Sequence, residues 1–147
     1  MLIHNTSQLL TLAGEPQRGR DLGRLGIIPA GAVLVRDGLI EAVGTSAELL
    51  DAYPNEDRFD AGGRAVLPGF VDPHTHLIWA GDRAAEFEMR LQGKTYLEIL
   101  AAGGGILSTV RASREATVEQ LKAETRPRMD ALLRHGTTTA EVKTGYG

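Results

Sequence analysis

Apolar residues in the first half of the chain come in short runs separated by turn residues. Met1–His4 and Gln8–Leu12 are predicted strands. The succession Ala32–Val35, Asp37-Gly38 and Leu39–Val43 predicts a β-hairpin, because Asp and Gly tolerate the positive φ angles of a tight turn. This half is therefore expected to be rich in β-structure.

The remaining segments of this half supply loops and short elements around those strands. Gly14–Gly26, rich in Gly and Arg, is an expected exposed loop. Thr45 or Ser46 could cap a short helix, and Phe59–Val66 returns to strand character. We expect residues 1–66 to form a small, sandwich-like domain.

From Leu67 the pattern changes to an apolar strand, a long helical stretch and a second strand. Leu67–Val71 is the first strand, Thr117–His135 is the clearest helix, and Thr137–Lys143 is a β-branched strand. Pro127 is expected to kink the helix, because proline has no N–H for the backbone ladder. This order is the βαβ pattern of an α/β fold with a parallel sheet.

Shorter helical stretches are predicted between these strands. Apolar residues recur at helical spacing around Phe87 and around Tyr96. The triple glycine Gly103–Gly105 permits a close backbone approach or a mobile loop, and Ser108 or Thr109 could cap the turn that follows.

The composition is that of an ordinary globular protein, with 42% hydrophobic and 24% charged residues. Its net charge is -3, and it lacks the basic runs that bind nucleic acid or anionic membranes, so a small-molecule ligand is the expected partner. Without cysteine, any metal would need nitrogen and oxygen ligands. The sequence shows neither a secretory signal pattern nor the roughly 18 apolar residues that span a bilayer, so the cytoplasm is the expected location.

Two histidines stand just beyond the Leu67–Val71 strand. Because side chains alternate along a strand, His74 and His76 project from one face, which Asp72 shares, while Thr75 projects from the other. Two imidazoles at this spacing can meet one metal ion. An isolated His-x-His pair is more often incidental, because a metal site needs three or four ligands.

Motifs spread over the second half carry a resemblance to a known family. The stretch Pro68–His76 resembles the first-strand signature of the amidohydrolase superfamily, in which both histidines bind the catalytic metal. Four further segments, in this order, resemble imidazolonepropionases: Gly81–Arg83, Glu86–Lys94, Gly103–Arg111 and Glu141–Gly147. Residues 1–66 resemble that family more loosely.

The resemblance implies a fold and a chemistry. The fold is an amidohydrolase-type (β/α)₈ barrel, of which residues 67–147 would form the first βαβ portion, preceded by residues 1–66 as part of a composite β-sandwich. The chemistry is that of a histidine-degradation hydrolase, which opens the ring of 4-imidazolone-5-propanoate with water to give N-formimidoyl-L-glutamate.

The resemblance also assigns roles to four residues of this sequence. It implies that His74 and His76 bind one divalent or trivalent metal ion, zinc or iron, and that Arg83 and Tyr146 contact the substrate. A planar guanidinium can grip a carboxylate or carbonyl through two parallel hydrogen bonds. Without the resemblance, Arg83 would be a solvated surface arginine and Tyr146 a turn tyrosine packed over the barrel rim.

Two other charged residues lie near the same expected strand end. Glu141 and Lys143 are two apart and share a strand face. A lysine in the metal environment is one interpretation, but mutual ion pairing is the one we prefer, because imidazolonepropionases resemble the single-metal branch of the superfamily.

The length of the chain bears on whether the site is complete. A (β/α)₈ barrel needs about 250 residues, so the 147 residues are expected to be a fragment with an incomplete barrel. His4 is not a convincing third ligand, and His135 is better explained as a cation-capable residue at a helix end. The other ligands and the catalytic acid and base are expected beyond Gly147, so the chain alone is expected to be inactive.

Two alternatives to this function stay open on the sequence. One is another metal-dependent amidohydrolase, such as a cyclic amidase or a deaminase. The other is a non-catalytic, truncated homologue that serves only in association. The full-length protein could also form a homodimer.

Overall fold

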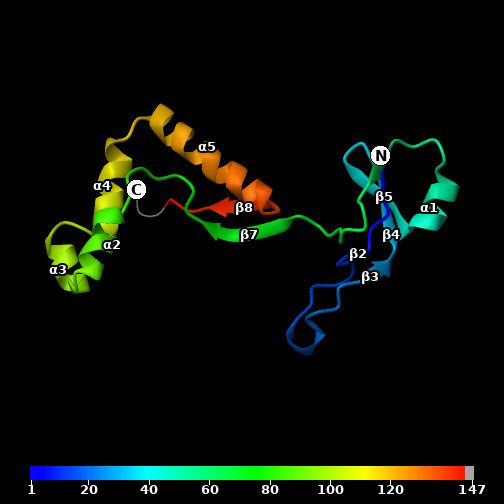
Figure 1. Ribbon diagram of the computed structural model, residues 1–147, viewed down its shortest axis with the longest axis horizontal. Coiled ribbons are helices and arrows are strands. Elements are labelled where there is room, and N and C mark those ends of the chain that lie inside the picture. The colour runs from blue at the N-terminus through cyan, green and yellow to red at the C-terminus, as the bar shows by residue number, and fades with distance from the viewer. Residues whose placement is uncertain (145–147) are drawn as a thin grey trace. The chain divides into compact units, whose positions relative to one another are not determined.

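The computed structural model describes residues 1–144 and divides the chain into two compact units. The first is Met1–Pro68, and the second begins at Gly69. Strands dominate the first unit, whereas the described part of the second combines a pair of strands with four α-helices (Figure 1).

A four-stranded sheet organises the first unit, in the order β5-β4-β1-β6. Its strands are β1 (Leu2–His4), β4 (Gly31–Arg36), β5 (Leu39–Thr45) and β6 (Arg58–Asp60). β4 pairs antiparallel with β1 and β5, and β1 pairs parallel with β6. The predicted hairpin is confirmed: Asp37 and Gly38 join β4 to β5 with φ angles of 49° and 77°.

Two smaller elements accompany this sheet. β2 (Gln8–Leu10) pairs antiparallel with β3 (Ile27–Pro29), and the loop between them contains only a 3₁₀ turn, η1 (Gly19–Asp21). The strand predicted over residues 59–66 is shorter than expected. Beyond β6 it is reduced to an isolated bridge between Val66 and Leu9.

The helix of this unit, α1 (Ser46–Ala52), begins where the sequence predicts. The Thr45 hydroxyl accepts the N–H of Glu48, and the Glu48 carboxylate accepts the N–H of Thr45. This reciprocal capping box satisfies two backbone donors that a helix start leaves without partners.

The core of the first unit lies between this helix and one face of the sheet. Its buried side chains are Leu2, Ala32, Leu34 and Leu49, with Ala42, Leu50 and Tyr53 packed against them. The opposite face carries Ile3, Val33, Val43 and Phe59, which are cross-strand partners. Phe59 and Val43 remain 56% and 45% exposed there, so this second face of the sheet is only partly covered.

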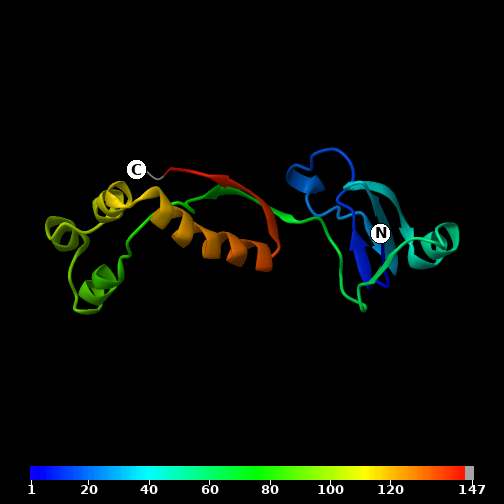
Figure 2. The same cartoon turned by 90° about the horizontal axis from the view of Figure 1, so that it is seen from above.

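The second unit is built on the parallel pair β7 (Phe70–Thr75) and β8 (Thr137–Val142). The βαβ order and the parallel pairing are as the sequence predicts. Four helices connect the strands: α2 (Ala84–Leu91), α3 (Tyr96–Ala101), α4 (Ile106–Glu115) and α5 (Val118–Arg134). α5 lies alongside β7 and β8, whereas α2, α3 and α4 gather beyond the carboxyl ends of the strands (Figures 1 and 2).

The long helix follows its predicted bounds. Thr117 caps the start of α5 by accepting the N–H of Gln120, His135 is its C-terminal cap, and Pro127 stands inside it. Within residues 1–144, none of the helices has the length and apolar character needed to cross a bilayer.

One helix differs from the prediction. Ser108 and Thr109 do not cap a turn, because they lie inside α4, whose N-cap is Gly105 at φ 74° with no side-chain bond. The glycine segment makes a close approach: a Cβ at Gly104 would lie 2.8 Å from Cγ2 of Ile99. The backbone there takes a path that side chains would obstruct.

The two strands of the second unit leave much apolar surface uncovered. Phe70 and Val71 of β7 are 54% and 65% exposed, and Val142 of β8 is 42% exposed. In α5, no residue is fully buried. Parallel sheets are ordinarily covered on both faces, so these two strands expose more apolar surface than is usual for parallel strands.

Candidate functional site

The two histidines lie side by side at the carboxyl end of β7. Their ring centroids are 5.2 Å apart and the ring planes are inclined by 68°. Both residues are exposed. On the other side of the strand, the Thr75 hydroxyl donates to the carbonyl oxygen of Glu141 at 3.0 Å, and the Thr75 carbonyl accepts the N–H of Lys143 at 2.8 Å. Pairing with β8 therefore fixes the strand end that carries the imidazoles.

The donor set suits part of a metal site. Two imidazoles are the nitrogen ligands that zinc and iron accept, and the Asp72 carboxylate braces the strand by accepting the N–H of His74 at 3.1 Å. In the part of the chain that is described, no group of three His, Cys, Asp or Glu side chains could hold a metal. His135 caps α5 instead, with its Nδ1 2.7 Å from the carbonyl oxygen of Ala131. His74 and His76 could thus supply two ligands of a larger set.

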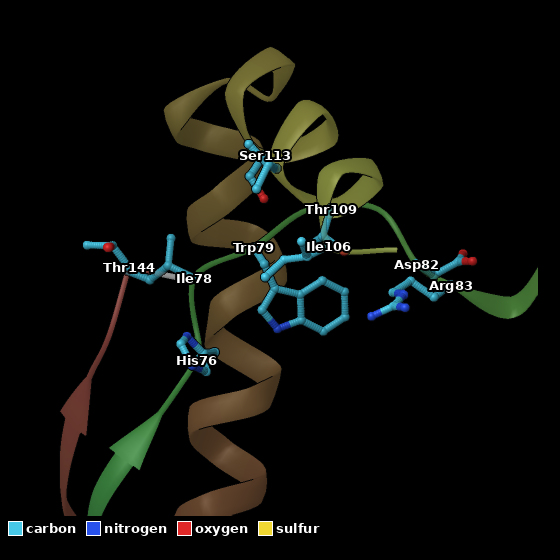
Figure 3. Close-up of a pocket in the computed structure, with 10 residues that line it drawn as sticks. His76, Ile78, Trp79, Asp82, Arg83, Ile106, Thr109, Ser113 and Thr144 are labelled. Atoms are coloured by element: carbon cyan, nitrogen blue, oxygen red, sulfur yellow. The ribbon is translucent and has the colours of Figure 1, made fainter. Parts of the chain in front are cut away.

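A cavity of about 380 Å³ opens next to this strand end (Figure 3). It is lined by His76, Ile78, Trp79, Asp82, Arg83, Ile106, Thr109, Val110, Ser113 and Thr144. The structure therefore brings His76 and Arg83, two of the residues singled out in the sequence, to one cavity. Tyr146 lies outside the described residues.

Arg83 is held by a buried carboxylate. Its Nε and Nη2 donate to Oε2 of Glu86 at 2.9 and 2.5 Å. The hydrogen bond to this carboxylate raises the pKa of Arg83 further, and the same bond lowers the pKa of Glu86. The arginine is 43% exposed, but it is not simply a solvated surface residue, since one edge of its guanidinium is fixed.

A second arginine holds the segment between His76 and Arg83. Nη1 of Arg128, on α5, donates to the carbonyl oxygens of Leu77 and Trp79, each at 2.8 Å. The same guanidinium lies over the Trp79 ring, 3.6 Å from its centroid, where the ring quadrupole attracts the cation. This clamp connects the longest helix to the cavity wall.

α4 provides the opposite wall of the cavity. Ile106, Thr109, Val110 and Ser113 all line it, and the Ser113 hydroxyl accepts the N–H of Ala80 at 3.2 Å. These positions follow an i, i+3, i+4, i+7 spacing, which marks one face of a helix. This helix is not among those predicted from the sequence, because the three glycines before it are also compatible with a loop.

Other charged residues near the site make local contacts. Lys143 pairs with Glu141, as expected. Arg111 donates to the carbonyl oxygen of Gly103. Neither contact adds a ligand to the histidine pair.

Comparisons with known proteins show which families the chain resembles. The model of an imidazolonepropionase-like composite domain of bacteria matches residues 31–55, and that of an amidohydrolase family matches residues 57–102. The amidohydrolase family implies a metal cofactor. Among solved structures, guanine deaminase of E. coli has a TM-score of 0.63 over 96% of this chain and 30% of its own, at 23% identity. That likeness supports an amidohydrolase-like mixed α/β fold and nothing finer.

Curated relatives match far more closely. The imidazolonepropionase of Herpetosiphon aurantiacus is 53% identical over 99% of this chain and 34% of its own length. Those of Deinococcus radiodurans and Halobacterium salinarum are 54% and 58% identical, over 96% and 80% of the chain and 35% and 29% of their own length. The chain spans about a third of the length of the curated relatives that it matches. Over that span, the chain belongs to the imidazolonepropionase family.

Proposed function

We propose that these residues form part of an enzyme that hydrolyses 4-imidazolone-5-propanoate to N-formimidoyl-L-glutamate in histidine degradation, and that acts in the cytoplasm. The whole protein here means a polypeptide of the relatives' length that contains these residues. It could be obtained from the gene or by joining residues 1–147 to the remainder of the Herpetosiphon aurantiacus relative. The observation that carries the proposal is the cavity shared by His76 and Arg83, in a chain more than 50% identical to imidazolonepropionases.

His74 and His76 are the proposed metal ligands in this chain, and the ion is zinc or iron. At such a site the ion activates water and polarises a carbonyl group. The adjacent rings suit a shared cation because imidazole nitrogen is a good ligand for both metals. Further ligands, and the catalytic acid and base, would come from other parts of the whole protein.

The other residues of the cavity suit a small, flat, polar ring. Arg83 offers guanidinium N–H groups to a carbonyl or carboxylate oxygen, while Trp79, Ile106 and Val110 provide apolar walls. We propose Tyr146 as a second substrate contact, on the resemblance of the segment Glu141–Gly147. In the reaction, the carbonyl carbon gains a hydroxyl from water as its bond to the ring nitrogen breaks, and that nitrogen gains a proton.

The uncovered faces support the proposed architecture of the whole protein. β7 and β8 would be two strands of a (β/α)₈ barrel, because their exposed Phe70, Val71 and Val142 need covering. The partly covered sheet face with Val43 and Phe59 would likewise complete a composite β-sandwich. We propose residues 1–66 and 67–147 as the corresponding portions of these two domains.

A substrate panel tests the proposed activity. The whole protein is assayed with 4-imidazolone-5-propanoate, with other cyclic amides, and with aminated rings such as guanine. We expect the highest kcat/KM with the imidazolone. Preference for an aminated ring would favour a deaminase, and metal-free, inactive, folded protein would favour a non-catalytic homologue. Either result would overturn the proposal.

A further inference from the structure

Glu86 is a buried carboxylate that neither the metal pair nor the cavity lining accounts for. It is 7% exposed, and it lies on α2, three residues after Arg83. A charged group leaves water at a cost unless hydrogen bonds and an opposite charge compensate it. The contacts of Glu86 therefore indicate what this position does.

Both oxygens of the Glu86 carboxylate are engaged. Oε2 accepts Nε and Nη2 of Arg83, and Oε1 accepts the N–H of Gly105 at 2.7 Å. Gly105 is the N-cap of α4, a helix that lines the same cavity as Arg83. One side chain thus joins the guanidinium of Arg83 to the N-cap residue of that helix.

Among residues 1–144, Glu86 is the one hydrogen-bond acceptor for the Arg83 side chain, so one edge of the guanidinium is left for a ligand. A guanidinium has a side edge, formed by Nε and Nη2, and an end edge, formed by Nη1 and Nη2. The carboxylate occupies the side edge, so the end edge retains the donors for two parallel hydrogen bonds. Figure 3 shows the guanidinium extending toward the Trp79 indole, within the group of residues that line the cavity.

The glycine segment is shaped to reach this carboxylate. A Cβ at Gly104 would lie 3.2 Å from the carboxyl carbon of Glu86, and 2.9 Å from the carbonyl oxygen of Ile99. Gly103 and Gly105 have φ angles of 83° and 74°, a region that residues with a Cβ rarely adopt. The glycines allow the backbone to approach Glu86 closely and present an N–H to it.

We propose that Glu86 is a positioning residue for substrate binding. It holds Arg83 by the side edge, turns the end edge toward the cavity, and ties this orientation to the start of α4 through Gly105. The role rests on the proposed function, because it requires Arg83 to contact the substrate.

A spectroscopic test examines the contacts of Glu86 with Arg83 and Gly105 independently of enzyme activity. In the whole protein labelled with ¹⁵N-arginine and ¹⁵N-glycine, the Arg83 Nε–H signal is identified by its loss in Arg83→Lys. We expect Glu86→Gln to shift the Arg83 Nε–H and Gly105 N–H signals and to speed their exchange with water. Glu88→Gln on the same helix is the matched control, since Glu88 is exposed and contacts neither group. Unmoved signals in a folded Glu86→Gln protein would overturn the proposal.

Kinetics test whether Glu86 acts through Arg83. Losing a charge-assisted hydrogen bond is expected to reduce kcat/KM about 10- to 100-fold in Arg83→Ala. We expect Glu86→Gln to reduce it about 10-fold, mainly through KM, since a misoriented arginine weakens ground-state binding as well. Glu86→Asp should retain more activity than Glu86→Gln, because it keeps the charge.

The double substitution distinguishes failure of the positioning role of Glu86 from failure of the proposed substrate contact of Arg83. If Glu86 positions Arg83, Glu86→Gln should have little further effect in an Arg83→Ala background. An undiminished effect there would overturn the positioning role. If Arg83→Ala leaves kcat/KM unchanged, the proposed substrate contact of Arg83 fails, while the spectroscopic result still decides whether Glu86 holds Arg83.

Discussion

At the scale of residues, the site combines exposed histidines with tightly held arginines. His74 and His76 have freedom to meet a cation, whereas Arg83 and Arg128 each have part of the guanidinium fixed by protein acceptors. Donors held in place by other protein groups are preorganised for binding a ligand. Arg83 lines the cavity itself, whereas Arg128 holds the backbone of Leu77 and Trp79 beside it.

Removing the Arg128 clamp should loosen the cavity wall. Arg128→Ala loses two hydrogen bonds to backbone carbonyls and the stacking on Trp79. We expect the unfolding free energy to fall by about 2–3 kcal/mol. Because Trp79 is the one tryptophan of the sequence, its fluorescence should also shift to longer wavelength as the ring becomes more exposed.

An exposed neighbour supplies the control for this measurement. Arg126, on the same helix, is exposed and should tolerate alanine within about 0.5 kcal/mol. Equal effects of Arg126→Ala and Arg128→Ala on stability and on the Trp79 emission would argue against a clamp.

Residue pairs close in sequence were the predictable ones. Strand alternation was sufficient to expect His74 and His76 side by side, and the pairing of Glu141 with Lys143 followed from the same spacing. The burial of Glu86 could not be predicted, because its acceptor role depends on Gly105, nineteen residues away, turning back toward α2. Nor does local spacing indicate that Arg128 meets Leu77 and Trp79.

At the scale of elements, local capping and turn chemistry account for most boundaries. Thr45 and Thr117 begin helices as the sequence predicts, and Asp37-Gly38 forms the hairpin turn. α4 was missed because its N-cap is a glycine without a side-chain bond. A helix that starts without a polar cap gives no start signal in the sequence.

Core packing should decide the stability of the first unit. Leu34 on β4 is fully buried between the sheet and α1, so Leu34→Ala is expected to cost about 2–5 kcal/mol of unfolding free energy through lost burial and a residual cavity. Hydrogen exchange of the β4 and β5 amides would measure it. Leu39→Ala, at a position 72% exposed, should change the exchange little, and an equal loss from both variants would contradict this core.

At the scale of the whole molecule, several carboxylates are bonded either to the first turn of a helix or to an arginine. Because these bonds need the ionised carboxylate, the folded structure should be most stable near neutral pH. Hydrogen bonds lower the pKa of five carboxyl groups below their ordinary values, chiefly bonds with the backbone or with arginine: Glu48, Glu56, Asp60, Glu86 and Glu98. A lowered folded pKa means that the unfolded chain takes up protons first as the pH falls.

Stability should therefore decline on acidification. The contribution of the glutamates is present above their unfolded pKa of about 4.5, and it is lost as the pH falls through their lower folded values. Urea unfolding between pH 7 and about pH 3 would measure the decline. Glu48→Gln removes one such group and should flatten the curve, and a stability that rises on acidification in this window would contradict the assignment.

Pairing of the strands was easier to predict than the covering of their faces. The parallel pair of β7 and β8 was predictable from the βαβ pattern, but none of the described elements covers the exposed side chains of Phe70, Val71 and Phe59. The proposed barrel and composite sandwich follow from those uncovered faces. Completing them would also complete the ligand set of the histidine pair.

The most direct test of the central claim measures metal content and hydrolysis of 4-imidazolone-5-propanoate together, in the whole protein. We expect bound zinc or iron and turnover in the parent protein. In the His74→Ala/His76→Ala double variant both should be lost, with metal affinity reduced more than about 100-fold, beyond the effect of changing an outer-shell partner. His135→Ala, which removes a helix-capping histidine, should retain both. A folded double variant with undiminished metal content and turnover would contradict the account.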